Sequence, residues 1–169
     1  MLKKLIMASV LSSLPLFAGE STGVVTKVID GDTLTVMIDK KEEKVRILYI
    51  DTPAKYSSAK LEKDAKKMGI AVSDELALGK LASDYASRFF KKGDSVLVDS
   101  EKKDQSGRIL ATVTKNGVDY SSQMIEDGYA CIYKKAAYPG ELEKALKRAK
   151  EEKKGLWSIN YDVMNKVCK

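Results

Sequence analysis

The sequence contains no histidine and only two cysteines, and no long apolar run follows residue 17. The absence of histidine excludes an imidazole zinc site and a Ser-His-Asp triad. It also removes the side chain that enzymes use most often as a general base. The chemistry open to this chain is therefore narrow.

The two cysteines, Cys131 and Cys168, lie far apart in the C-terminal part of the chain. Without histidine or a third cysteine they do not resemble a zinc site. An even pair in an exported protein predicts a disulfide that holds the C-terminal tail to the body. Two free thiols are the alternative.

The first eighteen residues have the pattern of a secretory signal peptide. Lys3 and Lys4 form a basic start, residues 5–17 are apolar, and a small residue, Ala18, ends the segment. The apolar run is short for a membrane span, and no cysteine stands at the exit for lipid attachment. We expect a signal peptide over residues 1–18 and export to the periplasm or the medium, without stable membrane association. An uncleaved N-terminal anchor is the alternative.

The remaining residues, 19–169, have the length and composition of a single soluble domain, which we expect to be monomeric. Hydrophobic residues make up 44% and charged residues 32% of the chain, as in ordinary globular proteins. The leader contains two lysines and no acids, so its removal would lower the net charge from +6 to +4. This modest positive charge permits contact with nucleic acid without proving it.

Hydrophobic periodicity predicts an α+β fold. Alternating and β-branched runs predict five strands, at residues 23–29, 33–39, 44–50, 95–99 and 109–114. Helical spacing predicts helices at residues 75–91 (capped by Asp74), 119–127 and 140–154, and a short helix at 59–68. Leu156 and Trp157 are expected to fold back into the core. This order matches a five-stranded OB-type β-barrel with about three helices, and an open three-stranded sheet with helices is the alternative.

The stretch from residue 28 to 53 places acids at the ends of two predicted strands. Asp30 and Asp32 precede the first strand, and Asp51 follows the second. Antiparallel pairing across a turn at residues 39–43 would bring Asp32 and Asp51 to the same end of the hairpin. Asp, Gly and Pro also end strands in general, so a purely structural role for these residues is the alternative.

Arg46 lies within the second of these strands. By the two-residue period it shares a face with Leu48 and Ile50 and lies opposite Ile47 and Tyr49. An arginine inside an apolar strand needs an anionic partner, because an unpaired buried charge is costly. Two carboxylates and an arginine at one sheet end are the groups that bind a hard cation and a phosphate.

Residues 54–72 form a long polar excursion rich in lysine, serine and alanine. Its lysines outnumber its acids. A run of this kind is most often the solvated face of a helix, and we favour that interpretation here.

Several motifs together resemble the staphylococcal nuclease (thermonuclease) family in order and approximate spacing. They are V-I-D-G-D-T at residues 28–33, Arg46 within V-R-I-L-Y-I, D-T-P at 51–53, Asp104 to Gly107-Arg108, and L-W-S at 156–158. Each motif is weak alone, but the combination is specific and covers about residues 23–158.

The resemblance implies an OB-fold nuclease that cleaves DNA and RNA with Ca²⁺. Asp32 and Asp51 match the family's calcium carboxylates, and Thr52 matches its carbonyl ligand. Asp30 would lie behind them or bind the ion through water. Arg46 and Arg108 match the two arginines that hold the scissile phosphate. Such a site needs no histidine.

One departure concerns the residue after D-T-P. The family has a glutamate there, commonly described as the general base, and this chain has Ala54, which cannot accept a proton. A carboxylate from the excursion or from the start of the next helix could take the place of this glutamate. Glu62 and Glu75 are preferred over Asp64 and Asp74.

A second departure concerns tyrosine. The family's tyrosine near the second arginine is missing, and Ser106 stands there. Tyr133 lies near the region where family tyrosines contact the nucleotide, and a core aromatic is the equal alternative.

The sequence therefore predicts an exported, Ca²⁺-dependent nuclease with slight sequence preference. The alternative is an OB-fold protein that binds nucleic acid without turnover, which Ala54 favours. A structural protein with a vestigial site is a third possibility.

Overall fold

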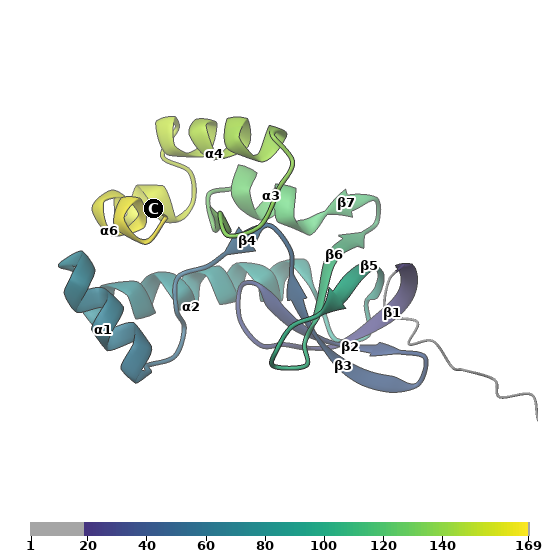
Figure 1. Cartoon of the computed structure of the whole chain (residues 1–169). Coiled ribbons are helices and arrows are strands. Elements are labelled where there is room, and N and C mark those ends of the chain that lie inside the picture. The colour runs from purple at the N-terminus through teal and green to yellow at the C-terminus, as the bar shows by residue number, and fades with distance from the viewer. Residues whose placement is uncertain (1–18, 169) are drawn as a thin grey trace, which may run out of the picture.

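The computed structural model describes residues 19–168 (Figure 1). The predicted signal peptide, residues 1–18, lies outside the described residues. The strands are β1 (Gly19–Val28), β2 (Thr33–Ile38), β3 (Lys41–Ile47), β4 (Ile50–Asp51), β5 (Ser95–Lys103), β6 (Ile109–Lys115), β7 (Val118–Asp119) and β8 (Cys131–Ile132). The helices are α1 (Ala59–Met68), α2 (Val72–Phe89), α3 (Tyr120–Glu126), α4 (Glu141–Glu151), α5 (Leu156–Ile159) and α6 (Tyr161–Val167). Within these residues, no helix has both the length and the apolar character to cross a lipid bilayer.

Five strands form a closed barrel. Their order is β3-β2-β1-β5-β6, all neighbours are antiparallel, and a parallel pairing of β3 with β6 closes the ring. The predicted α+β barrel is therefore confirmed, and the open three-stranded alternative is wrong. In β3 the side chains of Val45 and Ile47 are buried inside the barrel, whereas Arg46 between them points the other way.

The hairpin between β2 and β3 is tighter than predicted. Asp39 and Lys40 both have positive φ angles, 48° and 63°, which is typical of a two-residue hairpin turn with the twist of the flanking strands. Pairing therefore begins at once, with Ile38 opposite Lys41. The turn predicted over residues 39–43 is therefore too long, and the strand predicted over residues 44–50 was placed three residues late.

The chain leaves the barrel just after β3. Tyr49 has a φ of 68°, an unusual conformation for a bulky residue, and it redirects the chain into the short strand β4. The prediction that Leu48 and Ile50 continue the face of Arg46 is therefore wrong, because the strand ends before them. Ile50 is buried, and Asp51 after it is exposed.

The helices gather on one side of the barrel, with α2 running beneath α3 and α6 (Figure 1). Asp74 does not cap α2, because its N–H already bonds to the Ala71 carbonyl at 3.1 Å within the first helical turn. Leu156 and Trp157 are buried as predicted. The short C-terminal helix α6, capped by Asn160, was not predicted.

A disulfide joins Cys131 on β8 to Cys168 at the end of α6, with the two Cα atoms 5.2 Å apart. The predicted bridge is therefore present, and the alternative of two free thiols is wrong for this structure. Because Cys131 pairs directly with Asp51 in the β4–β8 ladder, the bridge attaches the C-terminal helix beside Asp51.

Helix α2 packs directly against the D-T-P-A segment through Gly79. A Cβ atom at this position would lie 2.1 Å from the Ala54 carbonyl oxygen and 2.6 Å from that of Pro53. Both contacts are with backbone atoms, so no side-chain rotation can relieve them. The missing side chain at Gly79 therefore lets the segment that follows Asp51 and Thr52 rest on the helix.

Replacing Gly79 with Ala is expected to lower the free energy of unfolding by about 1–3 kcal/mol, as overpacking does, despite the better helix propensity of alanine. Urea denaturation followed by circular dichroism measures it. Gly140→Ala is the matched control, because nothing lies within 4 Å of a Cβ atom built there. Equal stability of the two variants would contradict the close packing at Gly79.

Candidate active site

The Asp-Gly-Asp turn between β1 and β2 is held from several sides. The Asp32 N–H donates to the Asp30 carboxylate at 3.1 Å, and the hydroxyl of buried Tyr120 donates to the Gly31 carbonyl at 2.9 Å. A Cβ atom at Gly31 would lie 2.8 Å from the Thr52 methyl group. Glycine at this position therefore lets the turn approach the segment after β4.

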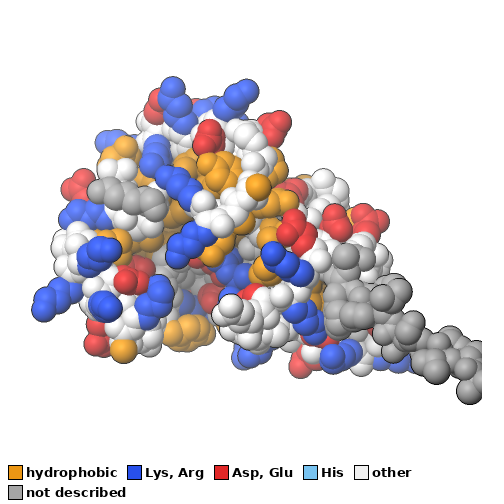
Figure 2. Space-filling view, viewed as in Figure 1, with side chains coloured by type: hydrophobic (Ala, Val, Ile, Leu, Met, Phe, Trp, Pro, Cys, Tyr) orange, Lys and Arg blue, Asp and Glu red, His pale blue; other side chains and the backbone are white. Residues whose placement is uncertain are grey.

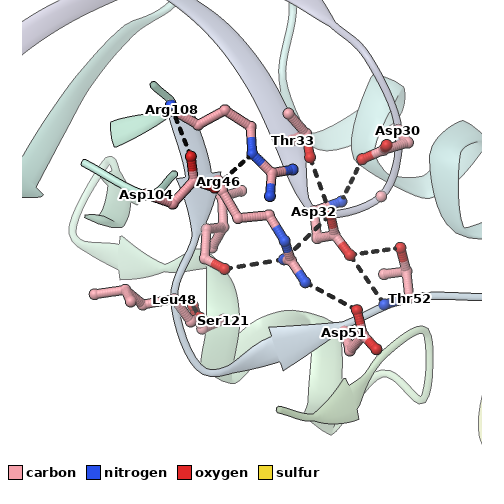
Figure 3. A network of polar contacts seen from close by, with 12 residues as sticks. Asp30, Asp32, Thr33, Arg46, Leu48, Asp51, Thr52, Asp104, Arg108 and Ser121 are labelled. Atoms are coloured by element: carbon pink, nitrogen blue, oxygen red, sulfur yellow. Dashed lines mark hydrogen bonds and ion pairs between the residues drawn. The ribbon is translucent and has the colours of Figure 1, made fainter. Parts of the chain in front are cut away.

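Arg46 contacts two acids at the open end of the β2–β3 hairpin, Asp32 before β2 and Asp51 after β3 (Figure 3). Its Nη1 lies 3.1 Å from Asp32 Oδ1, and its Nη2 lies 2.8 Å from Asp51 Oδ1. The arginine side chain is only 14% exposed, so both ion pairs compensate a largely buried charge. The predictions that Arg46 has anionic partners and that Asp32 and Asp51 meet at one end are confirmed.

Asp32 is the more tightly held of the two carboxylates. Its Oδ1 also accepts the Thr33 hydroxyl at 3.0 Å, and its Oδ2 accepts the N–H and hydroxyl of Thr52 at 3.0 and 2.9 Å. The Asp51 side chain, by contrast, is 55% exposed. The site thus combines one rigid carboxylate with one that faces solvent.

The acids create a local excess of negative charge. Burial, and then the charge of Asp32, raise the pKa of Asp30 to about 6. Partial desolvation and the same Asp32 charge raise the pKa of Asp51. A cation would relieve this repulsion, and the donors are all oxygens, as calcium prefers. Since residues 19–168 contain no cluster of three or more acidic, histidine or cysteine side chains suited to a metal, further ligands would have to be carbonyl groups or water.

Arg108 enters from the loop between β5 and β6. Asp104 accepts the Arg108 backbone N–H at 3.0 Å and the side-chain Nε–H at 2.8 Å, across a turn in which Gly107 has a φ of 78°. Figure 3 shows the Arg108 guanidinium extending toward the group formed by Asp32 and Arg46. Asp104 therefore orients the second arginine toward the first.

Tyr133 lies at the rim of this group, directly after β8. The Arg46 Cζ atom is 6.0 Å from the centre of its ring, and the side chain is exposed. The ring is therefore not part of the core, and its contact with a nucleotide stays a prediction.

Glu75 on α2 lies beside Ala54. Its Oε1 accepts the Ala54 N–H at 3.4 Å, while its buried Oε2 has no hydrogen-bond partner in the described part of the chain. The residue is 7% exposed, and burial raises its pKa against the opposing effect of the Ala54 hydrogen bond. Glu75 also lines a cavity of about 870 Å³ together with Asp51 and Thr52.

The other three candidate carboxylates are placed differently. Glu62 is exposed, does not line this cavity, and accepts the Ser57 hydroxyl at 3.5 Å. Asp64 lines the cavity but forms an ion pair with Lys60 at 2.8 Å. Asp74 is exposed in the first turn of α2. The structure therefore places Glu75, and not Glu62, beside the backbone of Ala54.

Sequence reasoning missed two supporting residues at the start of α3. Tyr120 binds the Gly31 carbonyl, and Ser121 donates to the Leu48 carbonyl at 2.9 Å. Both follow the helix cap Asp119, which the sequence does signal. Nothing in the sequence spacing shows which distant carbonyl groups they reach.

Comparison with known proteins adds independent findings. A family model described as "Staphylococcal nuclease homologue" matches residues 44–159. The chain is 32% identical over 161 residues to "Endonuclease YhcR" of Bacillus subtilis, covering 89% of this chain but only 12% of that protein. It is 32% identical over 148 residues to a "Thermonuclease" of Staphylococcus hyicus, covering 83% and 78% of the two chains. It is 28% identical over 147 residues to an "Uncharacterized endonuclease" of Escherichia coli, covering 86% and 83%.

Proposed function

Because the chain belongs to the staphylococcal nuclease family, we propose that it is a nuclease that hydrolyses phosphodiester bonds in DNA and RNA. The observation that carries the proposal is the arrangement of Arg46 between Asp32 and Asp51, with Arg108 directed toward the same group. Carboxylates for a cation and two arginines for a phosphate are the groups this reaction needs.

Ca²⁺ is the proposed cofactor. Asp32, Asp51 and the Thr52 carbonyl would hold the ion, with Asp30 behind them or acting through water. The excess negative charge around Asp30 supports this assignment. When bound, calcium would polarise a phosphoryl oxygen and help to position the attacking water.

Arg46 and Arg108 would bind the scissile phosphate. Arg46 forms an ion pair with Asp32, and its hydrogen bonds to the Asp51 carboxylate and the Ile47 carbonyl use two of its five N–H groups. The remaining donors can hydrogen-bond phosphate oxygens as negative charge grows in the transition state. Tyr133 at the rim would contact the nucleotide.

Glu75 is the proposed general base, because this chain has Ala54 where the family has a glutamate. Its carboxylate lines the same cavity as Asp51 and would accept the proton of the attacking water, and burial raises its pKa toward neutral pH, where bases work best. Glu62, the other carboxylate considered, is exposed and directed elsewhere.

Sequence preference should be slight, because the two arginines and the proposed cation bind phosphate, and no group named here is assigned a hydrogen bond to a base edge. We further propose that the protein is exported through a signal peptide at residues 1–18. Its apolar, lysine-initiated N-terminus and the disulfide of the mature part support export, since disulfides persist in oxidising compartments.

The test is cleavage of plasmid DNA by the purified mature chain in Ca²⁺, in Mg²⁺ and in excess chelator. Rapid cutting in Ca²⁺ that chelator abolishes is expected, because removing the cation leaves the phosphate oxygens unpolarised. Retention of DNA on a gel without cutting under any metal would instead support the binding protein that Ala54 favours.

A further inference from the structure

A second feature borders the candidate active site, between α1 and α6. The cavity of about 870 Å³ that includes Asp51 and Glu75 extends along one face of α1 to the end of α6. Four of its lining residues are lysines, which define what we call the lysine cavity: Lys60 and Lys67 from α1, Lys135 from the segment after β8, and Lys166 from α6. Figure 2 shows basic side chains gathered over this part of the molecule.

The acids in the wall do not neutralise these lysines fully. Asp51 is paired with Arg46, and Asp64 is paired with Lys60. The third acid, Glu75, is buried in the wall and forms no ion pair with the described residues, so three acids face four lysines. Lys67 and Lys135 form no ion pair with the residues that the structure describes, and both are exposed. The cavity therefore carries positive charge that an anionic ligand could compensate.

The cavity is also held in shape. Lys166 donates to the Gly69 carbonyl at 3.0 Å, which joins α6 to the end of α1. The disulfide between Cys131 and Cys168 fixes the other side of α6 to the strand beside Asp51. The lysines therefore lie on connected elements and not on a free tail.

We propose that the lysine cavity binds phosphate groups of a single nucleic-acid strand next to the bond that is cut. The inference rests on the proposed nuclease function and extends it to a neighbouring substrate site. A volume of about 870 Å³ is that of a pocket for a small ligand, so it accepts one or two nucleotides and not a rigid duplex. Lysine ammonium groups in a groove follow a strand backbone without reading its bases.

Charge reversal at the two unpaired lysines tests the proposal. The double variant Lys67→Glu/Lys135→Glu changes exposed side chains, so the fold should persist. The matched control is Lys92→Glu/Lys144→Glu, which changes the net charge equally at exposed positions outside the cavity. Fluorescence anisotropy measures the binding of a labelled single-stranded octanucleotide in excess chelator at several salt concentrations.

The cavity variant should bind the octanucleotide at least about 10-fold more weakly than the control variant. Its plot of log affinity against log salt should be shallower by about 1.4, the loss of two phosphate contacts on a single strand. Equal affinities and slopes in the two variants, or no binding by the unmodified protein at low salt, would overturn the proposal.

Cleavage assays in Ca²⁺ separate this proposal from the nuclease proposal. For the octanucleotide, kcat/KM should fall in the cavity variant, whereas for a dinucleoside monophosphate, which has no flanking phosphate, it should be unchanged. If the unmodified protein cuts neither substrate, the nuclease proposal fails, and the binding measurement still decides the role of the lysines.

Discussion

Replacing Asp32 with Ala is expected to reduce calcium-dependent cleavage by about 10³-fold or more. The variant removes a proposed calcium ligand and also the partner of Arg46 Nη1 and of the Thr52 N–H and hydroxyl. Arg46 would then lose one of its two anionic partners, and Thr52 would lose the contact that holds it beside the Asp-Gly-Asp turn. Initial rates on single-stranded DNA across a calcium titration measure the effect.

The matched control is Asp84→Ala, which removes an exposed carboxylate from the middle of α2 without a contact to the site. It should cleave at the rate of the unmodified protein. Thermal unfolding of both variants tests whether the fold is retained. A folded Asp32→Ala variant with undiminished cleavage would exclude Asp32 from the reaction, whereas lost cleavage with retained DNA binding separates turnover from affinity.

Replacing Glu75 with Gln is expected to reduce cleavage by about 10²–10⁴-fold, the range for a general base. Glutamine keeps the size of the side chain and an oxygen for the Ala54 N–H, but it cannot take a proton. The pKa of Glu75 is raised, chiefly by burial, so the active ionised form grows as pH rises through that value. The unmodified protein should therefore show an acid limb in its pH–rate profile, and the variant should lose it.

Glu62→Gln is the matched control, because it makes the same chemical change at an exposed residue of α1. A large loss in this variant with none in Glu75→Gln would reverse the assignment.

The stability of the Glu75→Gln variant offers a second check. The stabilisation linked to a raised carboxyl pKa is present below the unfolded-state pKa and is lost as pH rises through the folded-state pKa. Above that value, Glu75→Gln should unfold no more easily than the unmodified protein, so lost activity would not reflect lost structure.

Local features of the sequence determined the strands and the centre of the site, whereas tertiary packing decided that the strands close into a barrel through the pairing of β3 with β6. Strand periodicity and turn residues placed the five barrel strands, because alternation and positive-φ preferences act over a few residues. The need of Arg46 for an anionic partner also followed from local pattern, since a charged residue lay between apolar strand positions. The structure gives that arginine two carboxylates, Asp32 and Asp51.

Tertiary packing decided what lies around that centre. The sequence allowed four carboxylates as substitutes for the missing glutamate, and the approach of α2 to the D-T-P-A segment through Gly79 puts Glu75 beside Ala54, 21 residues away in the chain. The lysine-rich excursion looked like a solvated helix face, yet Lys60 and Lys67 share a cavity wall with Lys166 from the far end of the chain. Such contacts depend on how helices pack and where a disulfide joins them. The hydrophobic pattern of one segment does not show how far it lies from another segment in the folded chain.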